Sequence, residues 1–97
     1  MTDETGPAIE DEAAELRDAP VEIVLGAHVL GLLRLAAVHL AATPPELEPA
    51  RLAIDVVGAM VAAGGERLGE HVDLYRQALA EVQQVYVRAA APTPPEG

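Results

Sequence analysis

Three histidines, His28, His39 and His71, are the residues of this chain best suited to chemistry. The neutral imidazole of a histidine binds divalent metals, and the side chain gains or loses a proton near neutral pH. On one helix His28 and His39 would share a face, but their eleven-residue spacing separates them by about 16 Å, too far for one ion. No His-x-x-x-His pair or cysteine pair adds ligands. We predict hydrogen-bonded histidines with no metal site and no cofactor. A small-ligand or metal-binding helical bundle is the alternative interpretation.

Nucleophilic catalysis finds no support in the composition. The chain has no Ser, Cys, Lys or Asn, and its four Thr lie in the terminal segments or in a proline-rich loop. Covalent catalysis needs an activated hydroxyl, thiol or amine. Asp55 has two interpretations, an ion pair with Arg51 on its own helix, which we favour, or a contact to a more distant Arg. We predict a protein that is not an enzyme and has no catalytic residues.

Three stretches, residues 20–42, 49–63 and 68–90, repeat apolar residues at helical spacing. In the first stretch the apolar stripe covers more than half of the circumference, which is typical of a helix that packs on two sides. The third carries a coiled-coil-like seam with alternating steps of four and three. Its members are Leu68, Val72, Tyr75, Leu79, Val82, Tyr86 and Ala89. Prolines and glycines between the stretches predict short turns.

These elements predict an all-α fold, a small three-helix antiparallel bundle. Residues 19–91 would form the helical domain. Residues 1–18 are expected to be a disordered acidic tail, in which residues 8–16 form a helix only transiently, because they hold too little apolar surface to offset the cost of ordering. Residues 92–97 are expected to be a disordered Pro-rich tail. Whether Gly26 and Gly31 in the first helix allow close backbone approach stays open.

Charge excludes several classes of protein. The net charge is −10, and residues 1–19 hold seven acids against one Arg. Because the chain has no Lys and its six Arg are scattered, we predict no direct nucleic-acid binding. The acidic start lacks the features of an export signal. The longest apolar run, from Ile23 to Leu33, is shorter than the ~20 residues of a membrane span. We predict a cytoplasmic protein that does not bind membranes.

Self-association is predicted from the size of the apolar faces. A body this small buries only about 60% of its unfolded surface and is marginal alone. We expect a homodimer or a higher homo-oligomer formed through the first and third helices. The predicted interface residues are Leu25, Val29, Leu32, Tyr75, Leu79, Val82 and Tyr86. The acidic tail would attract a basic protein partner.

Three motifs in order carry a family resemblance over residues 20–90. They are His39-Leu40 at the end of the first helix, the Ala-x-x-x-Ile-Asp element that ends at Asp55, and Tyr86-Val87 near the end. With them the chain resembles the bacterial domain of unknown function (DUF) 1844 family. The resemblance implies an interaction module acting near the translation apparatus. Ala41 and the segment 64–68 depart from that family's Gly and Lys-Thr-x-Gly-Asn-Leu turn, so no role of that turn carries over.

Overall fold

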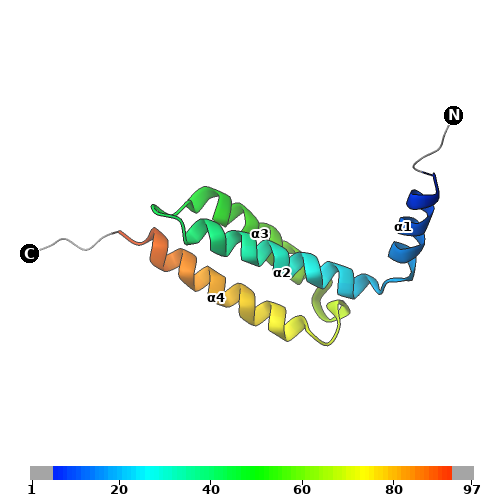
Figure 1. Ribbon diagram of the computed structural model, residues 1–97. Coiled ribbons are helices and arrows are strands. Elements are labelled where there is room, and N and C mark those ends of the chain that lie inside the picture. The colour runs from blue at the N-terminus through cyan, green and yellow to red at the C-terminus, as the bar shows by residue number, and fades with distance from the viewer. Residues whose placement is uncertain (1–5, 93–97) are drawn as a thin grey trace, which may run out of the picture.

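Three helices pack side by side in alternating directions (Figure 1). The computed structural model describes residues 6–92. Helix α2 spans Val21–Leu40, α3 spans Leu47–Gly64 and α4 spans Val72–Ala90, with a 3-10 helix, η1, at Gly65–Leu68. Each of α2, α3 and α4 contacts the other two, and η1 contacts all three. No strand occurs in residues 6–92, so the predicted all-α class is confirmed.

Prolines and glycines set the helix boundaries. Pro20 precedes α2 with extended torsions, and Pro49 lies in the first turn of α3, where a missing N–H costs nothing. Gly65, the first residue of η1, and Gly69, which follows its last residue, have φ of 52° and 95°, a region that only glycine enters without strain. The stretch predicted as one helix from residue 68 therefore begins as η1 and a turn, and α4 starts at Val72.

The core lies where the three helices meet. Its main cluster is formed by larger side chains from every element: Val29, Leu33, Val57, Val61, Leu68, Val72 and Tyr75. A second cluster, Ala36, Ala53 and Ile54, contains smaller residues. Among the residues with described burial, no polar or charged side chain other than that of Tyr75 is buried. Apolar burial, at about 25 cal/mol per Å², is thus the main stabilising contribution.

At Gly26, α2 lies against the side chain of Tyr75 from α4. A Cβ at this residue would overlap the hydroxyl of Tyr75 and lie 2.6 Å from its Cζ. By contrast, a Cβ at Gly31 would meet nothing within 4 Å. The question left open by the sequence thus has a different answer for each glycine. Gly26 makes room for the buried ring, and Gly31 faces open space.

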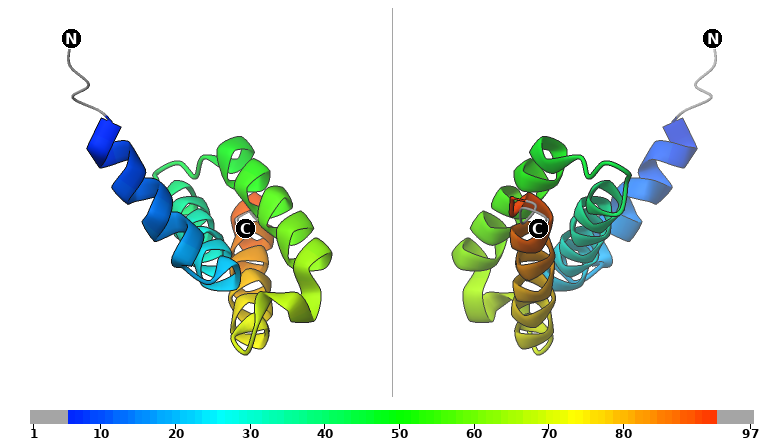
Figure 2. Two further views of the ribbon diagram at one scale, coloured as in Figure 1. Left: turned by 90° about the vertical axis from the view of Figure 1, so that its right-hand side faces the viewer. Right: turned by 90° about the vertical axis from the view of Figure 1, so that its left-hand side faces the viewer.

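Helix α1 spans Gly6–Asp18. This segment was predicted to be a disordered tail with only a transient helix at residues 8–16, but the structure has a helix over residues 6–18. The prediction overlooked how well the Ala and Glu residues of this segment suit a helix. The helix contacts no other element and points away from the bundle (Figure 2). Residues 1–5 of the predicted acidic tail, and the predicted Pro-rich tail from residue 93 onward, lie outside the described residues.

Candidate interaction surface

The three histidines make separate local contacts. His28 lies on the exposed side of α2, where its Nδ1 is 2.8 Å from the carbonyl oxygen of Val24. The Nδ1 of His39 lies 2.6 Å from Oε1 of Glu46, across the turn between α2 and α3. His71 sits 3.7 Å from the carboxylate of Glu70. Within the part of the chain that the structure describes, no three His, Cys, Asp or Glu side chains are grouped to hold a metal.

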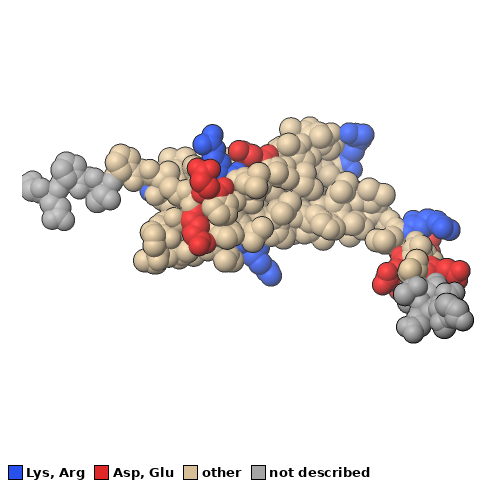
Figure 3. Space-filling view, turned by 90° about the horizontal axis from the view of Figure 1, so that it is seen from above, with Lys and Arg blue, Asp and Glu red and all other residues tan. Residues whose placement is uncertain are grey.

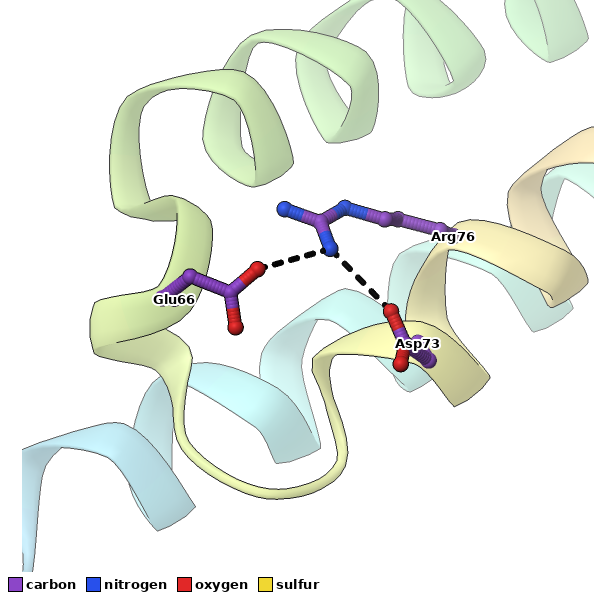
Figure 4. A network of polar contacts seen from close by, with 3 residues as sticks. All are labelled: Glu66, Asp73 and Arg76. Atoms are coloured by element: carbon purple, nitrogen blue, oxygen red, sulfur yellow. Dashed lines mark hydrogen bonds and ion pairs between the residues drawn. The ribbon is translucent and has the colours of Figure 1, made fainter.

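Arg76 holds two carboxylates at the turn that leads into α4. Nη1 of Arg76 donates to Glu66 and to Asp73, both at 3.1 Å (Figure 4). The hydrogen bond to Glu66, then that to Asp73, raises the pKa of the Arg76 guanidinium above its ordinary value. The trio joins η1 to the first turn of α4. All three side chains are solvent-accessible, so the trio resembles a surface clamp on the turn more than a catalytic group.

The predicted pair between Arg51 and Asp55 is confirmed. Nε of Arg51 lies 3.8 Å from Oδ2 of Asp55, one helical turn away on α3. Both side chains are well exposed, and a solvated pair of this kind contributes little to stability. Asp55 therefore has a partner on its own helix, as favoured from the sequence.

The predicted interface residues divide between the interior and the surface. Val29 is fully buried and Tyr75 is 4% exposed within one copy of the chain. The single subunit therefore leaves these two no surface to offer a partner. Leu79, Val82 and Tyr86 are half-buried against the same core. Leu32 is also half-buried, and Leu25 is 40% exposed.

A different row of α2 faces solvent. Opposite the core, α2 carries Ala27, His28, Gly31, Leu35 and Val38, which we call the outer face of α2. All five are exposed, Val38 at 61%. A shallow hollow lies at Ala27, His28 and Gly31. The sequence could have located this face, because α2 has more apolar positions than one core-facing row requires.

An apolar groove lies beside this face, between α2 and α3. One hollow, about 340 Å³, is lined by Leu32, Leu52 and Val56 among others. A second, about 260 Å³, is lined by Leu25 and Met60, with Arg67 at its edge. We call these five apolar residues, Leu25, Leu32, Leu52, Val56 and Met60, the α2–α3 groove. Charged side chains are confined to a few places on the face seen in Figure 3, with wide uncharged areas between them.

The uncovered apolar surface of α2 is also visible in its composition. Among the described residues, α2 is the one helix that is long enough and apolar enough to cross a membrane. Of the 18-residue stretch of α2 that meets this description, 22% is buried. Core helices of soluble proteins, which are mostly buried, and signal sequences near an N-terminus pass the same test, so length and composition alone are weak evidence of a membrane span. The exposure of α2 does require an explanation of what covers it.

Comparison with known proteins supplies no identity. No family model, no curated protein and no solved structure matches the chain. The resemblance to the DUF 1844 family therefore stays a prediction. The surface of α2 and the groove beside it are the features on which a functional proposal can rest.

Proposed function

We propose that this chain is a non-enzymatic helical interaction module that associates with a second copy of itself through the outer face of α2. The module would work in the cytoplasm. The resemblance carried by residues 20–90 adds that it acts near the translation apparatus, with the acidic N-terminal segment attracting a basic protein.

The observation that carries this proposal is the exposure of large apolar side chains on a helix that lies against the core. On the outer face of α2, Leu35 and Val38 are 46% and 61% exposed, and Val21, Ile23, Leu25 and Leu30 are each at least 40% exposed around the rest of the helix. Exposed apolar side chains that gather on a monomer usually mark a binding site. Burying these side chains against another copy would stabilise a bundle that is marginal by size.

The shape of the outer face suits a helix from another copy. Ala27 and Gly31 form a low point, and the larger side chains of Leu35 and Val38 stand to one side of it along the helix. When two such helices cross about a two-fold axis, the large side chains of one helix would fill the hollow at Ala27 and Gly31 of the other. An isologous interface requires this kind of self-complementary surface. No acidic residue occurs from Ile23 to Pro45. The acidic net charge of the chain therefore does not oppose this contact locally.

Two valines of similar exposure test the proposal. Val38 on the outer face of α2 is 61% exposed, and Val87 on α4 is 66% exposed. We expect the unmodified chain to sediment as a dimer at tens of micromolar and Val38→Glu to weaken the dimer at least tenfold, or about 1.4 kcal/mol, because a carboxylate would be desolvated in the interface. Val87→Glu should leave the dimer unchanged.

Sedimentation velocity over a concentration series measures both variants, and far-UV circular dichroism shows that each remains helical. A native chain that stays monomeric throughout this range would refute the proposal. The alternative is that a lipid surface covers the apolar face of α2. Flotation of the same proteins with vesicles of neutral phosphatidylcholine tests it. Flotation of the native chain together with a monomeric sedimentation profile would assign α2 to a lipid surface instead.

A further inference from the structure

Helix α1 and the α2–α3 groove are two further apolar features without a partner in the subunit, and the groove adjoins the outer face of α2 at Leu32 and Leu35. We infer that α1 of each copy seats in the α2–α3 groove of the other, so that the two subunits exchange N-terminal arms. This inference rests on the proposed self-association and adds a second contact to it. The occupant of the groove is thus a second copy of this chain.

Helix α1 has the form of an arm that packs on another surface. Ile9, Ala13 and Leu16 recur at steps of four and three, so they share one face of the helix. Ile9 is 56% exposed and Leu16 is 66% exposed, and α1 contacts no other element of its own subunit. A helix of thirteen residues is marginal in water without tertiary packing. The apolar stripe of α1 therefore has no partner within its own subunit in this structure.

The α2–α3 groove matches the length and character of that stripe. Ile9 and Leu16 are seven residues apart, and so are Leu25 and Leu32 on α2, which corresponds to about 10 Å in both helices. Leu52 and Val56 are 67% and 42% exposed on the opposite wall of the groove. A helix laid between α2 and α3 would complete a four-helix arrangement, in which facing apolar rows interdigitate.

Charge favours the same placement. Between Ile9 and Asp18, α1 carries five acids and one Arg, a net charge of −4. The α2 wall has no acid after Glu22, and Glu46 at the far end is paired with His39. At the other end Arg67 donates to the carbonyl oxygen of Ala63 at 2.9 Å. Among the described residues no carboxylate lies within ion-pair distance of Arg67, so its charge is available to the acidic arm.

The link between α1 and α2 favours exchange over folding back. Only Ala19 and Pro20 separate the two helices, and Pro20 has the extended torsions φ −61° and ψ 128°. Both views of Figure 2 show α1 directed away from its own bundle. An arm that leaves the subunit in this direction reaches a neighbour without a reversal of the chain.

Cross-linking tests this exchange directly, because the chain has no cysteine. In the double variant Ala13→Cys/Val56→Cys, a short bis-maleimide joins the middle of the α1 stripe to the groove. Arm exchange predicts a covalent dimer on a denaturing gel. A mixture of tagged Ala13→Cys and untagged Val56→Cys chains should likewise give the mixed dimer. Ala14 lies on the opposite face of α1, so Ala14→Cys/Val56→Cys is the matched control and should cross-link at least tenfold less.

A second pair of variants measures the contribution of the arm to affinity. Leu16→Asp places a charge in the stripe, and Ala14→Asp places the same charge on the solvent face. Neither residue contacts the bundle of its own subunit, so both variants keep their helical fold. We expect Leu16→Asp to weaken the dimer at least tenfold in sedimentation, with Ala14→Asp close to the native value.

The outcomes separate this inference from the proposed function. A native dimer in which Leu16→Asp and Ala14→Asp bind equally well would overturn arm exchange and leave self-association intact. An internally linked monomer from the Ala13→Cys/Val56→Cys double variant would show that the arm occupies its own groove, which also overturns exchange. A native chain that does not dimerise would overturn both.

Discussion

Helices α2 and α4 have nearly the same length but distribute their apolar residues differently. In α4, the row through Val72, Tyr75, Leu79, Val82 and Tyr86 points into the subunit. Most of the rest of α4 is polar or small, although Leu74, Val85 and Val87 are exposed. Helix α2 also contributes a core row, yet its other faces are mostly apolar, with Glu22 and Arg34 as its acidic and basic residues. Helix α4 buries most of its large apolar side chains within the subunit, whereas α2 leaves many of its own exposed.

The difference shows what apolar periodicity does and does not indicate. A seam such as that of α4 indicates that a helix packs, but its partner can belong to the same subunit. Surplus apolar positions outside the core row are the better sign of a further partner. This criterion favours the outer face of α2 over the α4 seam as the surface through which copies are proposed to associate.

The largest expected effect comes from removing the ring at the centre of the α4 seam. Tyr75→Ala should lower the free energy of unfolding by about 3 to 5 kcal/mol, because a buried aromatic side chain leaves a cavity. Leu74→Ala, at a neighbouring residue that is 53% exposed, should change it by no more than about 0.5 kcal/mol.

Urea denaturation followed by circular dichroism measures both changes, and the Val38→Glu background keeps the chain monomeric. A Leu74→Ala variant as unstable as Tyr75→Ala would show that α4 is not divided into a buried and an exposed side. The contrast between α2 and α4 would then fail on the α4 side.

An intermediate effect is expected from the two glycines of α2. Gly26→Ala should destabilise the subunit by about 1 to 3 kcal/mol, since the new methyl group would force the buried Tyr75 ring to move. Gly31→Ala meets open space and should stabilise the helix by about 0.5 to 1 kcal/mol.

Thermal denaturation in the Val38→Glu background isolates the effect within one subunit. Two glycine variants with changes of the same sign would contradict the assignment of Gly26 to the core side and Gly31 to the outer face. In the dimeric background, Gly31→Ala should in addition alter the association constant, because it fills part of the hollow at Ala27 and His28.

The smallest effect is expected at the surface clamp formed by Arg76 with Glu66 and Asp73. Arg76→Gln should destabilise the start of α4 by less than Tyr75→Ala or Gly26→Ala destabilises the subunit, because the three charged groups are solvated. The loss should shrink further at high salt, where surface charges are screened. Arg88→Gln, near the end of the same helix, is the control and should have no measurable effect.

Amide hydrogen exchange of residues 66–76 is the sensitive measurement, since it reports local opening of the turn. A faster exchange in Arg76→Gln at low salt, absent in Arg88→Gln, is the expected result. Equal exchange in both variants would show that the glycines of the turn hold it without the ion pairs.

The sequence predicted the helical class and the three packed helices because proline, glycine and apolar spacing act locally. It placed the Arg51 to Asp55 pair for the same reason. It assigned Val29 and Tyr75 to an interface between copies, whereas both side chains are buried within one subunit; the same periodicity satisfies both arrangements. It predicted a disordered tail with only a transient helix at residues 8–16, because the segment has few apolar residues, whereas its Ala and Glu residues favour the helix found at Gly6–Asp18. The open space at Gly31 depends on tertiary packing, which spacing does not encode.

The exposed apolar surface of α2 would make the assembly and the stability of this protein depend on its concentration. If the subunits associate as proposed, each subunit would be alone at low abundance, with the leucines and valines of α2 exposed to water. As abundance rises, mass action would bury those side chains between copies, and the melting temperature would increase. The expression level would therefore control both the thermal stability and the assembly of the protein, without any added ligand.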